Sequence, residues 1–208
     1  MLWSQEFNPG KERWQVKTSL IQNSEKKDIS LVELLHLQAP IQSYQNNIRS
    51  EFENQRFPAS IGRHHLREGD IITTYGYILL VAIEKNKKGE DGDYHIQIRT
   101  SPLWADSCLI IEATFPPFIK GNSALQDSCR KVRAFIDHFI LKGKKKVCFG
   151  TDGFPAPYAK ITGQLFFDAF HMNTIPRGKQ NCVTKNKMKS YTCWEIHPII
   201  AISIINKK

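Results

Sequence analysis

The sequence predicts a mainly β domain in which five strands close into a small barrel and one helix lies between the third and fourth strands. Five segments rich in β-branched and aromatic residues alternate apolar and polar side chains, which is typical of half-buried strands. The one long helical pattern falls after the third segment. We expect strands at Ile71 to Ile83, Tyr94 to Thr100, Cys108 to Phe115, Lys160 to Asp168, and Tyr191 to Ile205.

The predicted helix has a clear start, a regular apolar face and a clear end. Asn122 or Ser123 can cap it, and Gly143 follows its last turn. Its apolar residues recur at spacings of three and four: Leu125, Cys129, Val132, Ile136 and Phe139. Three strands, a helix and two strands is the element order of the OB-fold, a five-stranded Greek-key barrel. Gly76 and Gly163 lie inside two of the strands, as sharp coiling in a closed barrel requires.

We predict an N-terminal extension over residues 1–60 and the OB-like barrel over residues 61–208. In the extension, Ser30 and Glu33 form a capping box before a short apolar helix, which must end before Pro40. The stretch from Ile41 to Ser60 is polar and lacks periodicity, so we expect an irregular connection there.

Composition indicates a soluble cytoplasmic protein. The chain has 208 residues with 41% hydrophobic content, and no window approaches the roughly 20 apolar residues of a membrane helix. Residues 1–14 lack the apolar centre of a signal peptide, although a mature form cut from a precursor would look the same. The five cysteines are odd in number and show no paired spacing, so we expect reduced thiols.

Several strand segments together resemble a known family. They are Asp93-Tyr94-His95-Ile96, Ile111-Glu112-Ala113, Ile161-Thr162-Gly163 leading to Phe166-Phe167-Asp168 and His171, and Trp194-Glu195-Ile196-His197-Pro198. This series resembles a family of small, uncharacterised bacterial proteins with D-Y-H-hydrophobic, T-G-x-x-F-F-D and E-hydrophobic-H-P motifs in the same order. The resemblance spans roughly residues 70 to 205 and implies no function.

The polar faces of the predicted strands carry side chains capable of chemistry. The candidate metal ligands are His95, Glu112, Asp168, Glu195 and His197, and His171 is added as a candidate acid or base. Strand parity lets these side chains share one face. Imidazole with carboxylate suits zinc, manganese or iron. The alternatives are a structural network of hydrogen bonds and ion pairs, or contact with a ligand without catalysis. A thiolate zinc site from Cys148, Cys182, Cys193 and His197 lacks the usual close pairs.

Positive charge is concentrated in one part of the chain. The formal net charge is +9, and ten basic residues stand against two acids between Leu141 and Ser190. Beyond Lys142 and Lys160, this tract supplies the candidate nucleic-acid-binding residues Lys144, Lys145, Lys146, Arg177, Lys179, Lys185, Lys187 and Lys189. A basic tract attracts polyanions, although lysines in long loops also serve solubility alone. Tyrosines in the first two strands could stack on bases.

The sequence thus favours a non-enzymatic binding module for single-stranded DNA or RNA, or for another polyanion. One alternative is a metal-dependent hydrolase, a phosphodiesterase or nuclease, that uses the polar strand face and a possible divalent metal. Another alternative is a protein-interaction scaffold. No HExxH pattern, nucleophile elbow or glycine-rich phosphate loop is present.

Overall fold

The computed structural model describes residues 13–21, 24–42, 46–84, 91–104, 107–150, 154–180, 182 and 188–207. Its helices are α1 (Trp14–Lys17), α2 (Leu31–Leu35), α3 (Asn46–Phe52) and α4 (Ser123–Phe135), with the short helical turns η1 (Pro116–Phe118), η2 (Ile136–Leu141) and η3 (Ala169–Thr174). Its strands are β1 (Lys26–Asp28), β2 (Ile71–Ile83), β3 (Tyr94–Arg99), β4 (Leu109–Ala113), β5 (Lys146–Cys148), β6 (Tyr158–Phe167) and β7 (Trp194–Ile204).

Five strands close into a barrel in the order β2-β3-β4-β7-β6, and β6 returns to pair with β2. All pairings in the ring are antiparallel except the one between β4 and β7, which is parallel. α4 connects the third barrel strand to the fourth. This topology confirms the OB-like barrel that the sequence predicts.

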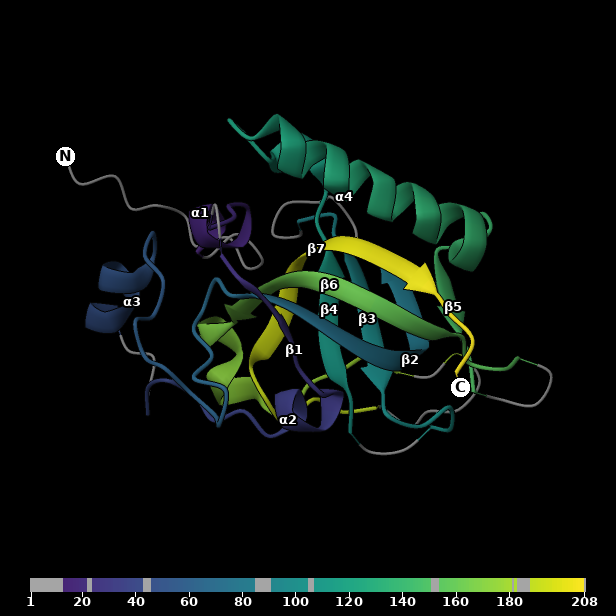
Figure 1. The fold of residues 1–208 in the computed structure, drawn as a ribbon, viewed down its shortest axis with the longest axis horizontal. Coiled ribbons are helices and arrows are strands. Elements are labelled where there is room, and N and C mark those ends of the chain that lie inside the picture. The colour runs from purple at the N-terminus through teal and green to yellow at the C-terminus, as the bar shows by residue number, and fades with distance from the viewer. Residues whose placement is uncertain are drawn as a thin grey trace.

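The barrel encloses the main apolar core, because alternate side chains of each strand point inward. The inward-facing residues include Ile72, Ile96, Ile98, Leu109, Ile111, Leu165, Phe167, Trp194 and Ile196. α4 and α2 add buried residues to the same core, among them Val132 and Leu34, and Figure 1 shows these two helices on opposite sides of the barrel. The core therefore continues through both ends of the barrel.

The local signals that predicted the two principal helices are present as expected. Ser30 Oγ accepts a hydrogen bond from the backbone N–H of Glu33, and Asn122 Oδ1 accepts one from that of Leu125. These side chains satisfy N–H groups that have no partner within the helix. α4 continues directly into η2, and Gly143 shortly after η2 has a φ of +81°, a conformation that favours glycine.

Gly163 permits the close approach of β6 and β7. A Cβ at this position would lie 2.4 Å from Ile196 Cγ2 and 2.6 Å from the carbonyl oxygen of Pro198. The pairing register between these strands shifts on both sides of Gly163. A larger residue would therefore push β7 outward at the point where the barrel bends.

The N-terminal extension contains more regular structure than its sequence predicts. α1 and β1 were not expected, and α3 lies in the 41–60 stretch that was predicted to be irregular. β1 pairs in parallel with β2 and so extends the barrel sheet. Short elements of this kind depend on tertiary contacts more than on periodicity.

No helix among the described residues is long and apolar enough to cross a membrane.

The expectation that all five cysteines are reduced is wrong for one pair. Cys148 and Cys182 form a disulfide, whereas Cys108, Cys129 and Cys193 are free and buried. The bond joins β5 to the connection between β6 and β7. Since disulfides persist mainly in oxidising compartments, the cysteines no longer support a cytoplasmic location. The disulfide also removes two thiols from the hypothetical thiolate zinc site.

A buried ion pair fixes the extension to the barrel. Arg13 donates to both carboxylate oxygens of Glu68 at 2.7 Å, and both side chains are fully buried. The same guanidinium donates to the carbonyl of Phe167 in β6. Glu68 in turn accepts from the backbone N–H groups of Phe57 and Phe167. One charge pair therefore joins α1, the chain after α3 and the end of β6.

We predict that Glu68→Gln lowers the free energy of unfolding by about 3–5 kcal/mol, because the Arg13 guanidinium then remains buried without its counter-charge. Chemical denaturation followed by circular dichroism measures the loss. The matched control is Asp127→Asn, which breaks an exposed pair with Arg130 and is expected to cost less than about 1 kcal/mol. Equal losses in the two variants would contradict this role for Glu68.

Candidate functional site

The polar residues singled out in the sequence come together on the outer face of β3, β4 and β7. His95 lies directly opposite Glu112 in the antiparallel pairing of β3 with β4. β7 runs beside β4 in the register that pairs Ile110 with Glu195, which brings His197 next to Glu112. Strand parity thus places these side chains on the face opposite the apolar core.

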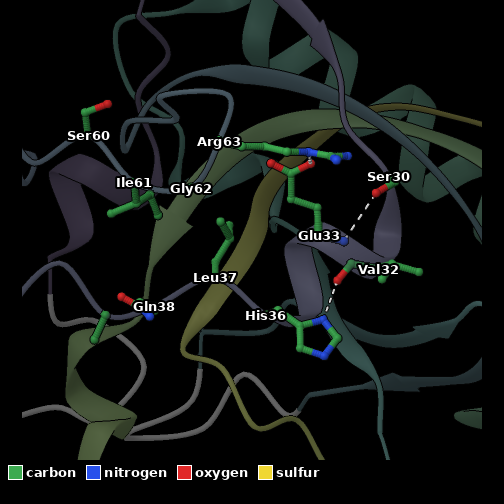
Figure 2. Close-up of a pocket in the computed structure, with 11 residues that line it drawn as sticks. Ser30, Val32, Glu33, His36, Leu37, Gln38, Ser60, Ile61, Gly62 and Arg63 are labelled. Carbon is green, nitrogen blue, oxygen red and sulfur yellow. Dashed lines mark hydrogen bonds and ion pairs between the residues drawn. The ribbon is translucent and has the colours of Figure 1, made fainter.

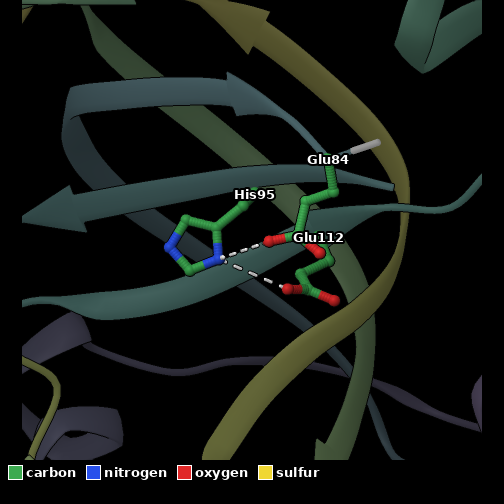
Figure 3. Close-up of side chains that lie close together, drawn as sticks. All are labelled: Glu84, His95 and Glu112. Atoms are coloured by element: carbon green, nitrogen blue, oxygen red, sulfur yellow. Dashed lines mark ion pairs between the residues drawn. The ribbon is translucent and has the colours of Figure 1, made fainter. Parts of the chain in front are cut away.

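Glu112 lies between the two histidines and contacts both. Glu112 Oε1 is 3.4 Å from His95 Nδ1, and Glu112 Oε2 is 3.1 Å from His197 Nδ1. On its far side, His197 Nε2 is 3.2 Å from Asp93 Oδ2. On the other flank, Glu84 approaches His95 Nδ1 at 3.9 Å, and Figure 3 shows Glu84 and Glu112 both directed at the His95 ring.

Arg177 links this cluster to the remaining two predicted carboxylates. Its Nη2 forms ion pairs with Glu195 Oε1 and with Asp168 Oδ2, the latter at 3.1 Å. His171 Nδ1 contacts the same Asp168 oxygen at 2.5 Å. The expectation that His95 and His197 share a cluster with at least two of the predicted carboxylates is therefore confirmed for Glu112 and Glu195. Asp168 and His171 join through Arg177.

The centre of the cluster is buried even though it lies outside the barrel core, while Glu84 and His171 at its edges are partly exposed. His197 is 0% exposed and Glu195 is 1% exposed. The segments that cover this face include the β6–β7 connection and α1. The connection between β6 and β7 contributes Arg177, and α1 contributes Lys17, whose side chain is itself 4% exposed and lies 3.5 Å from Asp91.

The charged groups shift one another's pKa values. Burial by itself lowers the pKa of His197, but the close approach of Asp93, Glu112 and Glu195 outweighs burial and raises this pKa well above its usual value. Burial raises the pKa of Glu112, yet His197 and His95 hold it well below its usual value. For Asp93 burial dominates and raises the pKa to about 6.

The sequence did not identify three members of the cluster. Asp93 and Glu84 flank the connection between β2 and β3, and Asp93 shares strand parity with His95, so extension of the alternating pattern could have found it. Lys17 carried no such signal, because it lies on a four-residue helix. Arg177 was predicted as a nucleic-acid contact, whereas its side chain is 13% exposed and held in ion pairs.

The lysine-rich tract divides into exposed and engaged residues. Lys142, Lys144, Lys145, Lys146 and Lys189 are exposed, and Lys146 Nζ also donates to the carbonyl oxygen of Gln180. Lys179 is partly buried and forms a 2.6 Å ion pair with Glu84. Lys185 and Lys187 lie outside the described residues, so their prediction is untested.

A second surface combines one exposed and two half-buried tyrosine rings with lysines, and we call it the tyrosine–lysine surface. It consists of Tyr75 and Tyr77 on β2, Tyr158 and Lys160 on β6, and Lys207 after β7. Tyr75 pairs across the strands with Lys160, and Tyr77 with Tyr158. Lys160 Nζ lies 5.9 Å from the centre of the Tyr75 ring, and Lys207 Nζ lies 5.1 Å from that of Tyr77. Tyr94 and Phe166, by contrast, are buried.

A cavity of 630 Å³ lies between α2 and the turn at residues 60–63. Figure 2 shows Glu33, His36 and Arg63 around it, with the Glu33 carboxylate paired to Arg63. The lining is mixed, and its charges are already paired near solvent. This cavity is separate from the buried cluster.

Comparison with known proteins assigns no class. No family model matches the chain, and the searches of curated proteins and of solved structures found no match. The fold and the site geometry therefore carry the functional argument.

We predict that Asp168→Asn lowers the free energy of unfolding by about 3 kcal/mol near neutral pH, because Arg177 and His171 lose a buried counter-charge. Burial would raise the pKa of Asp168, but Arg177 and His171 hold it well below its usual value. Its stabilising contribution is therefore present above about pH 4, the unfolded value, and declines below it.

Denaturant titrations of wild type and Asp168→Asn at pH 3, 5 and 7 measure this effect. The stability difference between the two proteins should narrow below about pH 4. A difference that is constant from pH 3 to pH 7 would show that the Asp168 charge does not stabilise the fold.

Proposed function

We propose that this protein is a non-enzymatic module that binds single-stranded nucleic acid through the tyrosine–lysine surface. The observation that carries the proposal is the exposed Tyr75 ring, 38% accessible, beside Lys160 on the outer face of the β2–β6 pair. Proteins that bind single strands combine aromatic platforms for bases with lysines for phosphates. This surface offers both on rigid strands.

The other rings support the same interpretation. Tyr77 and Tyr158 lie 4.8 Å apart between ring centres, and the Lys207 ammonium lies near both rings. Successive bases of a single strand could therefore contact successive rings. Every base has an aromatic face, so we expect little sequence preference.

Exposed lysines elsewhere would add affinity that depends on salt. Lys144 and Lys145 follow η2 and have exposed side chains. Neutralising phosphates releases counterions, and this favours binding most at low ionic strength.

Burial of the acidic cluster favours a binding function over a hydrolase. A metal-dependent hydrolase must bring its substrate to the metal ligands, whereas His197 and Glu195 lie beneath Arg177 and are almost fully inaccessible. The tyrosine–lysine surface needs no opening. A protein-interaction scaffold is the outcome if nucleic acid does not bind.

We predict that Lys160→Glu with Lys207→Glu weakens binding to a fluorescein-labelled 20-mer of dT or of U at least 10-fold at about 50 mM salt. The two lost phosphate contacts should also reduce the slope of log affinity against log salt by about 1.4. Fluorescence anisotropy over a salt series measures both quantities.

The matched control is Lys120→Glu with Lys131→Glu, which makes the same charge change at exposed positions beside and on α4. It should weaken binding much less. Equal weakening in the two double variants would show that binding depends on the net charge of the protein and not on the tyrosine–lysine surface. Absence of wild-type binding at 50 mM salt would overturn the proposal.

We also predict that Tyr75→Ala weakens binding about 10-fold with an unchanged salt slope, because a stacked base contributes about 1–3 kcal/mol and no charge is altered. Tyr75→Phe keeps the ring and should bind like wild type. If both variants bind equally to wild type, Tyr75 does not stack on a base.

A further inference from the structure

We propose that Asp93, Glu112 and His197 hold one divalent transition-metal cation, of the zinc, manganese or iron type. These three side chains come from the start of β3, from β4 and from β7. One ligand atom from each lies within 4.8 Å of the other two. Two carboxylates and an imidazole form a ligand set that suits these ions.

The distances within the cluster fit a coordination sphere. With metal–ligand bonds of about 2.1 Å, neighbouring ligand atoms are about 3.0 Å apart in an octahedral site and about 3.4 Å apart in a tetrahedral one. His197 Nε2 and Asp93 Oδ2 are separated by 3.2 Å, which fits an ion bound between them. Glu112 Oε2 lies 3.1 Å from the other ring nitrogen, Nδ1. The three ligand atoms lie within 4.8 Å of one another, so the Glu112 carboxylate must turn from Nδ1 towards this ion to complete the set.

The polar atoms at this point have contacts but no aligned hydrogen bonds. Both ring nitrogens of His197, Asp93 Oδ2 and Glu195 Oε2 are buried without a hydrogen-bond partner. A buried polar group left in this state is costly. An ion between His197 Nε2 and Asp93 Oδ2 would satisfy these two atoms, which direct hydrogen bonds do not.

The surroundings would also orient a metal-bound imidazole. A histidine that ligates a metal through one nitrogen usually donates its other N–H to a carboxylate. Glu195 Oε2 lies 3.9 Å from His197 Nδ1, and Arg177 holds the other oxygen of Glu195. Once Glu112 turns from Nδ1 to the ion, Glu195 is the carboxylate left beside Nδ1 to accept this N–H, and Arg177 keeps that carboxylate in place.

The neighbouring group of Glu84, His95 and Glu112 is a weaker candidate, although its ligand atoms are equally close. Lys179 Nζ already lies 2.6 Å from Glu84 Oε1. An ammonium at this distance competes with a cation for the same oxygen. Among the ion pairs of the described residues, none joins a lysine or an arginine to Asp93 or Glu112, although the Lys17 charge acts on Glu112 and His197 from nearby.

The experiment unfolds the protein in guanidinium with EDTA and removes the EDTA while the guanidinium is still present. The guanidinium is then removed in the presence of Zn²⁺, Mn²⁺ or Fe²⁺, supplied singly under anaerobic conditions. Refolding admits the ion before the site is covered. We expect about one metal per chain after gel filtration, by elemental analysis, and a melting temperature at least about 5 °C above that of protein refolded with EDTA.

Two variants locate the site. Asp93→Asn should reduce metal affinity at least 10-fold, whereas Glu84→Gln, a matched change in the neighbouring group, should retain the metal. Wild-type affinity in Asp93→Asn would overturn the assignment. If Asp93→Asn fails to fold, the metal content of the refolded wild type tests the proposal. Wild type that retains none of the three metals contradicts it. Nucleic-acid binding is measured separately, so either proposal can fail alone.

Discussion

The constraint on which this structure depends is the burial of a charged strand face outside the barrel core. Successive side chains of β3, β4 and β7 point alternately into and out of the barrel. Because the apolar side chains fill the interior, the opposite face must carry His95, Glu112, Glu195 and His197. Charges on a surface strand would ordinarily meet water. Here α1 and the connection between β6 and β7 cover them, so each charge needs a partner from the cover or from a neighbouring strand.

Charge balance explains which residues the cover contributes. The carboxyl groups of the cluster and its borders are Glu84, Asp91, Asp93, Glu112, Asp168 and Glu195. The permanent cations beside them are Lys17, Arg177 and Lys179, and all three belong to the covering segments. Carboxylate neighbours outweigh burial and raise the pKa values of His171 and His197, so these two imidazoles supply further positive charge unless a metal ion takes that role. The occupancy of the cluster by protons or by an ion therefore affects how firmly the cover is held.

Sequence reasoning recovered the features that follow from local periodicity and missed those that depend on partners distant in the chain. The five strands, α4 and its Asn122 cap were predictable, because each signal lies within one segment. The convergence of His95 and His197 followed once the strand order was known. The ion pairs of Arg177 could not be predicted, since the sequence of a basic loop is the same whether its arginine faces solvent or contacts Glu195. The Cys148–Cys182 bond was missed because the two residues approach only when the β6–β7 connection folds over β5.

The outer face of the barrel is thus divided into two sectors with different physical requirements. Ion pairs in water contribute little, so a network that fixes geometry is effective only where the cover excludes solvent, as it does over β4 and β7. Tyrosine rings and lysines can remain in water without such a penalty, and these are the residues on the exposed β2–β6 sector. β2 belongs to both sectors, since residues 71–77 pair with β6 and residues 77–83 with β3. β2 therefore connects the part of the sheet that the buried network holds at β3 with the part that presents Tyr75.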